Sequence, residues 1–501
     1  MKMPGYPRKR LLLVAAVAAA AATVMVTNPA RASDHSSTPA NPGLAFEASN
    51  YPSAQTTEKL YDELDYQRAV QAYIWGQPLV GLGAMREGAR RIGIQPMELF
   101  VFDQGEQVNQ ALQTGNDDVI YSFSYFNLKE SGPLVVEIPP GNQYGVVLDA
   151  WQRPIDDVGR IGPDQGKGGK YLIVPPGYSG ALPENGYFVR PSQTVNGMLF
   201  LRAVRLPGET RDSATSRLAQ AKIYPYTQRS APPALRMRRM GHTAYDGVTP
   251  RGMAYFDLLA QYVREEPGNE RDRIMLGMLA TLGIERDKPF TPDARLRVIL
   301  QQAEQTGRAM VANLEFNPRR ERPTFFEGTQ WRGSTGLVHY SQERGPLTEV
   351  DERAALFRFG FAMHKFLDPA IKPIVGKGGA YATSYRDARG KYLVGNKTYR
   401  LHVPANVPVA EYWSVTAYDA DTFHFVDTEQ KRPSLSSLKD LPRNADGSID
   451  LYFGPQAPQG MSANWIKTVP GKGFLLLLRL FSPTQALYDQ SWKLGDVEEV
   501  E

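Results

Sequence analysis

The residues best suited to chemistry are carboxylates at the ends of short apolar runs. Asn116 and Asp118 directly precede the run that holds Tyr121. Asp149 ends a second run, and Asp157 follows it closely. A carboxyl group packed beside a strand can have a shifted pKa and can then act as a general acid or base. The sequence therefore predicts a polar site in this region, with Asp118 or Asp157 as the acid or base.

Two arginines stand inside apolar runs, Arg202 within 197–207 and Arg479 within 473–483. A charge in such a run needs a partner, because the desolvation of an unpaired ion is costly. An arginine paired with one of the aspartates could hold a carboxylate for acid–base or ligand work. The alternative is a structural salt bridge that ties two strand ends together, and the sequence leaves both interpretations open.

We predict a catalytic set and a substrate-contacting set from these residues. The catalytic residues are Asp118, Tyr121, Asp157 and Arg479, and the substrate contacts come from Asn116, Asp149, Trp151, Trp413 and Asp419. In this hypothesis Tyr121 donates a hydrogen bond and Arg479 stabilises an anion or oxyanion. A divalent metal held by the oxygens of these residues is a further expectation, since hard cations prefer oxygen ligands. The sequence names no other cofactor.

Several familiar kinds of site are excluded by composition or spacing. The chain has no cysteine, which excludes thiolate metal sites, a cysteine nucleophile and iron–sulfur clusters. Its six histidines are scattered and form none of the close pairs typical of zinc sites, and a lone histidine is more often structural than catalytic. No Gly-x-Ser-x-Gly turn is present. The segments 166–170 and 444–450 are interpreted as turns between strands rather than as phosphate or calcium loops.

The N-terminus has the features of a secretory signal peptide. A basic start is followed by the apolar run 11–26 and by Ala30-Arg31-Ala32, which predicts cleavage after Ala32 and a periplasmic or secreted protein. The alternative is an uncleaved membrane anchor, although 16 apolar residues are few for a span. Cleavage removes five basic residues and lowers the formal charge from +4 to about −1. The mature chain is then expected to bind no nucleic acid and to keep no membrane span.

The expected elements divide the remaining chain into four parts. A flexible leader covers 33–56. The part 57–207 begins with a helix from Thr57 to Ile92, which is kinked or interrupted near Pro78. The strands that follow in this part form a first β unit. The part 208–380 is mainly helical, and its last helix is expected from Asp351 to Leu367. The part 381–501 is again rich in strands.

The two β-rich parts contain segments with similar sequence patterns. Residues 197–207 and 473–483 have the same length, and each begins with Gly, continues as an apolar run interrupted by Arg, and ends with Pro. Such runs are typical of strands that are buried on both faces. We therefore expect a mainly β fold of two related sandwiches with a central helical region.

At these motifs the chain resembles bacterial exported proteins that pair the domains of unknown function DUF1254 and DUF1214. The N-terminal resemblance rests on Tyr73-Ile-Trp-Gly-Gln-Pro-Leu79, Asn116-x-Asp118-x-x-Tyr121, Asp149-Ala-Trp151 and Gly166-Lys-Gly-Gly-Lys-Tyr-Leu172. The C-terminal resemblance rests on Tyr412-Trp-Ser-Val-Thr416, Tyr452-Phe-Gly-Pro455, Asn464-Trp465 and the Arg479 strand. It implies two jelly-roll-like sandwiches with helical insertions, and no established activity. The chain departs from the usual family residues at three positions. It has Asn127 where Asp is common, Val119 where Thr is common and Gln143 where Arg is common.

Three functions are consistent with these features. The first is a hydrolase or lyase that acts on a small-molecule or sugar-like substrate at the junction of the two sandwiches. The second is a non-catalytic envelope protein that binds a ligand or carbohydrate through exposed Trp and Tyr rings. The third is an assembly protein whose sandwiches stack into homo-oligomers. Carboxylates that converge in a closed cleft would favour the enzyme, whereas an open aromatic platform would favour binding.

Overall fold

The computed structural model describes residues 44, 45, 47, 50–205, 208–333, 336, 337, 339–368 and 374–500. The expected signal peptide lies outside these residues, as does much of the expected leader. The chain divides into two compact units, Met1–Lys59 and Leu60–Glu501, and the features below belong to the second. Helix accounts for 27% of the described residues and strand for 26%, so the fold is mixed rather than mainly β. Among the described residues, no helix is long and apolar enough to cross a membrane.

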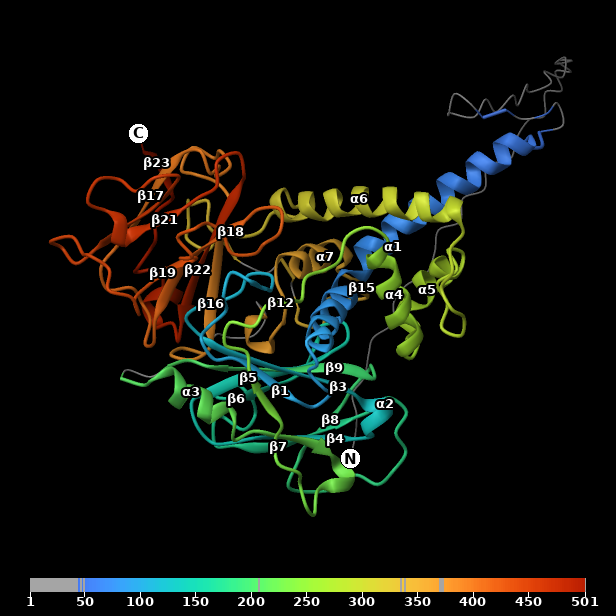
Figure 1. Cartoon of the computed structure of the whole chain (residues 1–501), viewed down its shortest axis with the longest axis horizontal. Helices are drawn as coiled ribbons and strands as arrows, with labels where there is room; N and C mark the ends of the chain where they lie inside the picture. The colour runs from blue at the N-terminus through green and yellow to red at the C-terminus, as the bar shows by residue number, and fades with distance from the viewer. Residues whose placement is uncertain are drawn as a thin grey trace, which may run out of the picture. The chain divides into compact units, whose positions relative to one another are not determined.

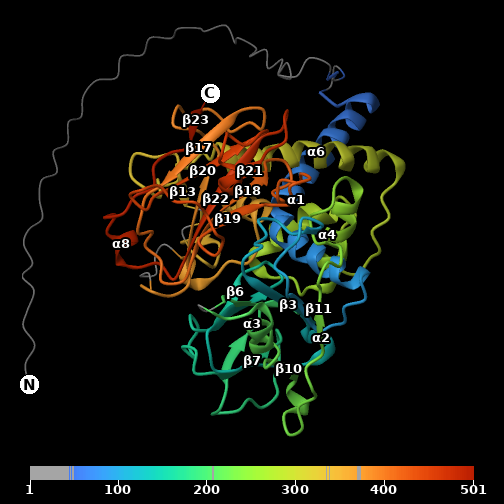
Figure 2. The same ribbon diagram turned by 60° about the vertical axis from the view of Figure 1, so that its left-hand side comes forward.

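The first β unit consists of two sheets that share one core (Figures 1 and 2). The six-stranded sheet has the order β11-β1-β3-β9-β5-β6, and the four-stranded sheet has the order β10-β4-β7-β8. Their bounds are β1 (Leu99–Phe102), β3 (Ile120–Asn127), β5 (Gln143–Asp149), β6 (Pro154–Gly159), β9 (Asn196–Ala203) and β11 (Met237–Arg239) in the first, and β4 (Leu134–Ile138), β7 (Gly169–Val174), β8 (Phe188–Pro191) and β10 (Lys222–Pro225) in the second. Apolar side chains from both sheets form a single buried cluster, so the sheets pack face to face.

Strand β9 lies inside the larger sheet and is buried on both faces. Leu199 and Leu201 point into the core between the two sheets. Met198 and Phe200 belong instead to a second cluster, which includes residues of the helices. Because successive side chains of a strand alternate between its faces, Arg202 lies on the same face as Phe200.

The second β unit repeats this plan near the C-terminus. Its five-stranded sheet has the order β13-β16-β22-β18-β19, and its four-stranded sheet has the order β21-β20-β17-β23. The strands of the five-stranded sheet are β13 (Arg332–Gly333), β16 (Gly379–Ser384), β18 (Trp413–Asp419), β19 (Ser434–Ser436) and β22 (Phe474–Phe481). The strands of the four-stranded sheet are β17 (Thr398–Val403), β20 (Ile449–Gly454), β21 (Trp465–Lys467) and β23 (Glu498–Val500). In β22, Leu476, Leu478 and Leu480 fill the core between the sheets, and Leu475 and Leu477 face the other way with Arg479.

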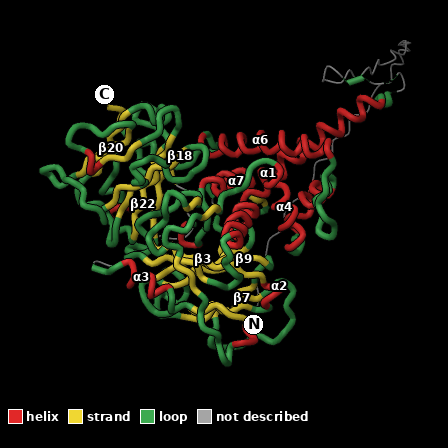
Figure 3. Tube along the Cα trace, in the orientation of Figure 1, coloured by secondary structure: helices red, strands yellow, loops and turns green. Residues whose placement is uncertain are grey.

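The longer helices α1, α4, α6 and α7 lie together beside the strands, as Figure 3 shows, whereas the short helices α2 and α3 lie at the sheets of the first β unit. Their bounds are α1 (Ala54–Arg91), α4 (Met253–Glu265), α5 (Arg273–Ala280), α6 (Ala294–Phe316) and α7 (Val350–Phe359), with the short helices α2 (Leu128–Ser131), α3 (Arg211–Leu218) and α8 (Gln485–Tyr488). Two small ladders complete the fold, β2 (Gln110–Ala111) with β12 (Tyr245–Asp246) and β14 (Glu343–Arg344) with β15 (Leu347–Thr348).

Helix α1 runs through Pro78 without an interruption, whereas the sequence predicts either a kink or an interruption there. Proline removes one helical hydrogen bond and crowds the preceding turn. The hydroxyl of Tyr255 on α4 donates to the carbonyl of Tyr73 at 2.6 Å in that turn. A neighbouring helix therefore supplies a bond where the proline disturbs the ladder.

Helix α7 ends earlier than predicted. It stops at Phe359, with Gly360 as an extended C-cap, and the short 3₁₀ helix η3 (Lys365–Leu367) begins only after His364. Ala362, between these two helices, has a positive φ of 63°, which an α-helix does not allow. Residues 360–364 therefore form an irregular connection, called here the strap.

Candidate functional site

An arginine lies between polar side chains on each of the two large sheets. On the first sheet, Tyr121 of β3 pairs with Arg202 of β9, which pairs in turn with Tyr144 of β5. On the second sheet, Tyr381 of β16 pairs with Arg479 of β22, which pairs with Ser414 of β18. Side chains at paired positions of adjacent strands lie side by side on one face. Each sheet thus presents a guanidinium beside a tyrosine hydroxyl.

The two sets of paired side chains, one from each sheet, line a cavity of about 80 Å³, called here the junction cavity. Its polar lining residues come from both β units, Thr114, Tyr121 and Arg202 from the first and Tyr381 and Arg479 from the second. The rest of its wall is apolar and is formed by Leu477, by the end of α7 and by the strap. The cavity therefore combines concentrated positive charge with a largely apolar wall.

Arg202 is the most unusual residue of this cavity. It is only 6% exposed, and its Nε and Nη1 atoms are buried without a hydrogen-bond acceptor among the described residues. Its guanidinium lies over the rings of Phe200, Tyr121 and Tyr144, with centroids at 4.4, 5.5 and 5.6 Å. Aromatic faces stabilise a cation only in part. A buried guanidinium with free N–H groups can donate hydrogen bonds to a bound anion.

Arg479 is bonded, but to neutral groups. It donates to Thr416 Oγ1 at 3.0 Å and to the carbonyls of Thr114 and Gly115 at 2.6 and 2.9 Å. Within the described residues, neither Arg202 nor Arg479 forms an ion pair with a carboxylate. The predicted pairing of these arginines with an aspartate is therefore wrong.

Strained backbone borders the cavity on two sides. Thr114 has a φ of 46° and Ala362 a φ of 63°, both in the left-handed region that residues with a Cβ seldom adopt. Gln152 holds the strap in place, because its Oε1 accepts from the N–H of Ala362 at 3.1 Å and its Nε2 donates to the carbonyl of Pro78 at 2.9 Å. The strained positions are thus fixed by bonds from distant segments.

Asp157 lies next to the site, paired with a histidine that the sequence did not single out. His364 Nδ1 is 2.9 Å from Asp157 Oδ1, and the ring is fully buried. A carboxylate at Nδ1 favours the tautomer with the proton there and leaves Nε2 as the free acceptor. Nε2 is buried without a partner among the described residues. Burial and the nearby Arg202 charge lower the pKa of His364 to about 4, although Asp157 opposes this shift.

Asn116 adjoins the cavity, whereas Asp118 belongs to a separate polar cluster. Asn116 Oδ1 accepts from the N–H of Asp118 at 2.8 Å, and its Nδ2 donates to the Tyr412 hydroxyl at 3.2 Å. Asp118 lies near Ser434 and Lys439 of the second β unit, at 3.4 and 4.0 Å. Burial and the neighbouring Asp117 raise the pKa of Asp118 to about 6.

The remaining predicted residues lie away from the cavity. Asp149 accepts from the backbone of Trp151 at 2.9 Å and faces Arg153 at 3.5 Å. Trp151 packs against Trp75 in the helical core. Trp413 is buried between the sheets of the second β unit, and Asp419 caps its own turn and meets Lys472 at 3.2 Å.

The structure thus brings Tyr121 and Arg479 together, with Asn116 and Asp157 beside them. Sequence reasoning left Tyr144, Tyr381 and His364 out of the site and named Arg202 only as a buried charge. The one signal for Arg202 was the similar sequence pattern of its strand and the Arg479 strand. Nothing local marked Tyr381 or His364.

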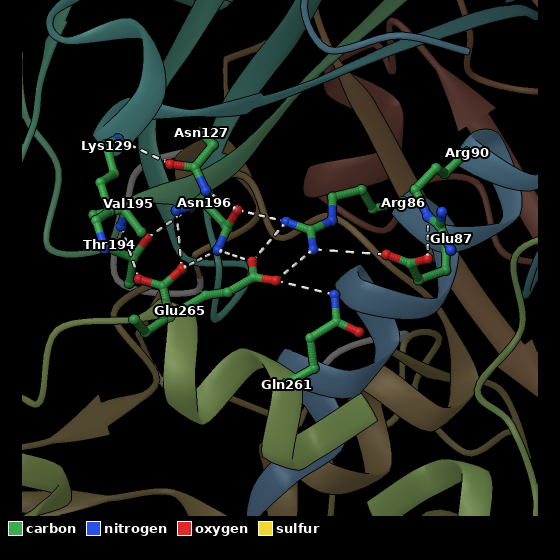
Figure 4. A network of polar contacts seen from close by, with 11 residues as sticks. Arg86, Glu87, Arg90, Asn127, Lys129, Thr194, Val195, Asn196, Gln261 and Glu265 are labelled. Carbon is green, nitrogen blue, oxygen red and sulfur yellow. Dashed lines mark hydrogen bonds and ion pairs between the residues drawn. The ribbon is translucent and has the colours of Figure 1, made fainter. Parts of the chain in front are cut away.

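A fully satisfied arginine elsewhere provides a contrast (Figure 4). Arg86 on α1 reaches both carboxylate oxygens of Glu265 on α4, at 2.9 and 3.0 Å, and donates to Asn196 Oδ1 at 2.6 Å. Asn196 in turn donates to Glu265 at 2.9 Å. This network borders a larger cavity of about 700 Å³. Because its charges already pair, we interpret it as a tie between α1, α4 and β9.

Two family models match separate parts of the chain. Residues 101–225 match the model described as "Protein of unknown function (DUF1254)", and residues 378–485 match "Protein of unknown function (DUF1214)". The chain pairs a DUF1254 domain with a DUF1214 domain. The DUF1254 match contains Tyr121 and Arg202, and the DUF1214 match contains Tyr381 and Arg479. The junction cavity therefore takes one arginine and one tyrosine from each domain.

Two solved structures align with this chain at low sequence identity. The crystal structure of the VPA0106 protein from Vibrio parahaemolyticus aligns with a TM-score of 0.52 and 16% identity, over 87% of this chain and 100% of that one. The crystal structure of an uncharacterized protein from Burkholderia cenocepacia aligns with a TM-score of 0.39 and 12% identity, over 89% and 97% of the two chains. A search of curated proteins found no match.

Proposed function

We propose that this protein is an enzyme, a lyase or hydrolase, that acts on a small organic anion in the junction cavity. The observation that carries this proposal is the buried Arg202 guanidinium, whose Nε and Nη1 find no acceptor among the described residues. Arg479 adds a second positive charge to the same cavity. A carboxylate there would neutralise charge that the described side chains leave unpaired.

Each polar group around the cavity has a role in this proposal. Arg202 and Arg479 hold the carboxylate, and Tyr121 and Tyr381 donate hydrogen bonds to it. His364, oriented by Asp157, is the general base. His364 would take the proton from the carbon next to the carboxylate, and the electron pair would move onto the carboxylate, where the arginines lie. The same pair would then form the carbon–carbon double bond as a substituent on the β-carbon leaves with its own bonding electrons. This arrangement favours a lyase, because the apolar wall limits the water that a hydrolase needs.

Non-catalytic ligand binding is the second candidate. It is favoured by the absence of carboxylate side chains from the lining of the cavity. The carbohydrate form of this hypothesis has less support, since five of the six tryptophans are buried and Trp465 is half-buried. Among the described residues, no three His, Asp or Glu side chains gather as metal ligands would, so the expected divalent metal gains no support either.

Export and a jelly-roll-like connectivity belong to the same proposal. The signal-like residues 1–32 support a periplasmic or secreted location, with cleavage after Ala32. The paired sheets of each β unit support the jelly-roll-like sandwich that the family resemblance implies. Sequencing the N-terminus of the protein recovered from its native host would test the cleavage site directly.

A turnover screen tests the enzymatic proposal. The purified protein is incubated with a mixture of small metabolites, and their loss is followed by mass spectrometry. We expect the wild type to consume carboxylates, Arg202→Met to reduce the rate at least about 100-fold, and Tyr381→Phe to reduce it about tenfold. Tyr399→Phe is the matched control, because Tyr399 lies in the core between the C-terminal sheets. Consumption that Arg202→Met leaves unchanged would contradict the proposal, whereas carboxylate binding without turnover would favour the second candidate.

A further inference from the structure

A second cavity lies directly outside the junction cavity. It measures about 330 Å³ and is called here the outer cavity. At two points along the chain, neighbouring residues line different cavities, so these residues, called here the wall, stand between the two cavities. Gln113 lines the outer cavity, and its neighbour Thr114 lines the junction cavity. Likewise, Arg358 lines the outer cavity, and its neighbour Phe359 lines the junction cavity.

Phe423 completes this wall from the second β unit. It lines the outer cavity, and its ring packs against that of Phe359 with centroids 5.4 Å apart. Its carbonyl accepts from the N–H of Thr114 at 2.7 Å. Phe423 and Thr114 both have positive φ, 56° and 46°. Strained backbone is typical of functional elements, and here it occurs on both sides of one wall.

The outer cavity carries more positive charge than its carboxylates balance. Arg251, Arg308 and Arg358 all approach the single carboxylate of Asp421, at 2.9, 3.5 and 3.7 Å. Arg308 also lies 3.3 Å from Glu304, which is not part of the lining.

The other charged lining residues of the outer cavity are paired among themselves or with neighbours. Arg91 meets Asp246 at 3.6 Å, and Glu87 meets Arg90 at 2.6 Å. Arg358 Nε and His424 Nε2 are buried without a partner among the described residues. An anion entering this cavity would therefore meet three arginines around Asp421, of which only Arg308 has a second carboxylate, Glu304.

We propose that the outer cavity is the entrance subsite, which collects the anionic substrate before it passes the Phe359–Phe423 wall. This inference rests on the proposed function of the junction cavity, and the substrate class is a small organic carboxylate. A cleft lined by one sign of charge raises the local concentration of an oppositely charged ligand and its association rate. Asp421 acts in this picture as a resident carboxylate that the ligand displaces.

Association kinetics of two fluorinated probes test the inference. Trifluoroacetate and 4-fluorobenzoate are followed by ¹⁹F NMR relaxation dispersion on the full chain. In Arg251→Gln/Arg308→Gln we expect the association rate to fall about tenfold at low salt, with the dissociation rate changed less than about twofold. Asp421→Asn should raise the association rate. The differences should shrink at about 0.5 M salt, where charges are screened.

A matched control shows whether the effect depends on where the removed charges lie or only on how many are removed. Arg400→Gln/Arg432→Gln removes the same charge from residues that line neither cavity, and it should leave association within about twofold of wild type. Equal association rates for the two double variants would overturn the inference.

The variant Arg202→Met separates this inference from the proposed function. If it abolishes probe binding while both double variants associate at the same rate, the proposed function stands and the entrance subsite fails. If the Arg202→Met chain binds the probes as the wild type does, the proposed function fails, and the inference fails with it. Failure of the wild type to bind either probe would overturn both.

Discussion

At the scale of single residues, the site depends on charges that this chain buries and does not pair. Desolvation of an unpaired ion is costly, so such groups persist where a ligand or a reaction uses them. Arg202 has no acceptor for two of its nitrogens among the described residues, and His364 has none for Nε2. Arg86, with its three bonds to Glu265 and Asn196, shows that the same chain can satisfy a partly buried guanidinium. We infer that the lack of partners at Arg202 is functional.

The protonation of His364 gives the first prediction. Burial and Arg202 lower its pKa to about 4, so the ring should be neutral and able to accept a proton at all higher pH values. NMR of histidine-labelled protein should show no titration of His364 between about pH 5 and pH 8, where an ordinary histidine titrates. In Arg202→Met the pKa should rise because one lowering cause is removed. The His364→Gln variant assigns the signal, and a wild-type midpoint near 6.5 would refute the role of burial and Arg202.

At the scale of elements, two long buried strands and the strap position the site. Strands β9 and β22 each place leucines toward a sandwich core and one arginine toward the junction. The period of two along a strand thus turns a nearly continuous apolar run into one apolar face and one functional face. The strap lines the cavity, and Gln152 accepts a hydrogen bond from its backbone.

The strap gives the second prediction. Gln152→Ala removes the acceptor of the Ala362 N–H and the donor to Pro78, so both backbone groups lose a buried partner. We expect the free energy of unfolding to fall by about 1–3 kcal/mol. Hydrogen exchange of residues 360–364 should become faster than in the wild type. Gln490→Ala, which removes a partly buried amide elsewhere, is the control. Unchanged exchange in the strap would show that Gln152 does not hold it.

The elements were more predictable from sequence than the site. The expected strands around Tyr121, Tyr144 and Arg202 lie close to β3, β5 and β9, because alternation and β-branched composition are local signals. The helix end at Phe359 was missed, although Gly360 marks it, because the apolar spacing continues into the strap. The partners were not predictable: His364 follows Asp157 by 207 residues, and only the folded topology brings them together.

At the scale of the whole molecule, the site exists because two domains are joined. A polar tie joins the two domains, where Lys439 Nζ of the second β unit donates to Asp117 Oδ2 at 2.8 Å and Ser434 Oγ donates to Asp117 Oδ1 at 2.6 Å. The Tyr418 hydroxyl also donates to the carbonyl of Gly115. Since each domain supplies one arginine, the affinity for an anion should depend on how well these ties hold the domains in place.

This tie gives the third prediction. Lys439→Met leaves Asp117 and Asp118 close together without their cation. Because Lys439 is partly exposed, we expect a loss of only about 1–3 kcal/mol in the free energy of unfolding. Loss of the cation raises the folded-state pKa of Asp118 further above its unfolded value, so the deficit should grow as the pH rises through about 6. Urea unfolding at several pH values measures this. Lys493→Met, an exposed lysine on the same domain, is the control, and a deficit independent of pH would contradict the assignment.

The central claim is that Arg202 and Arg479 form a site for an anion. The most direct measurement is the anomalous scattering of bromide in crystals of the full chain soaked with a bromide salt. We predict a bromide peak in the junction cavity, within hydrogen-bonding distance of Arg202 Nε or Nη1, and its loss in Arg202→Met. A wild-type crystal in which Arg202 instead bonds a carboxylate of its own chain, with no bromide in the cavity, would contradict the account.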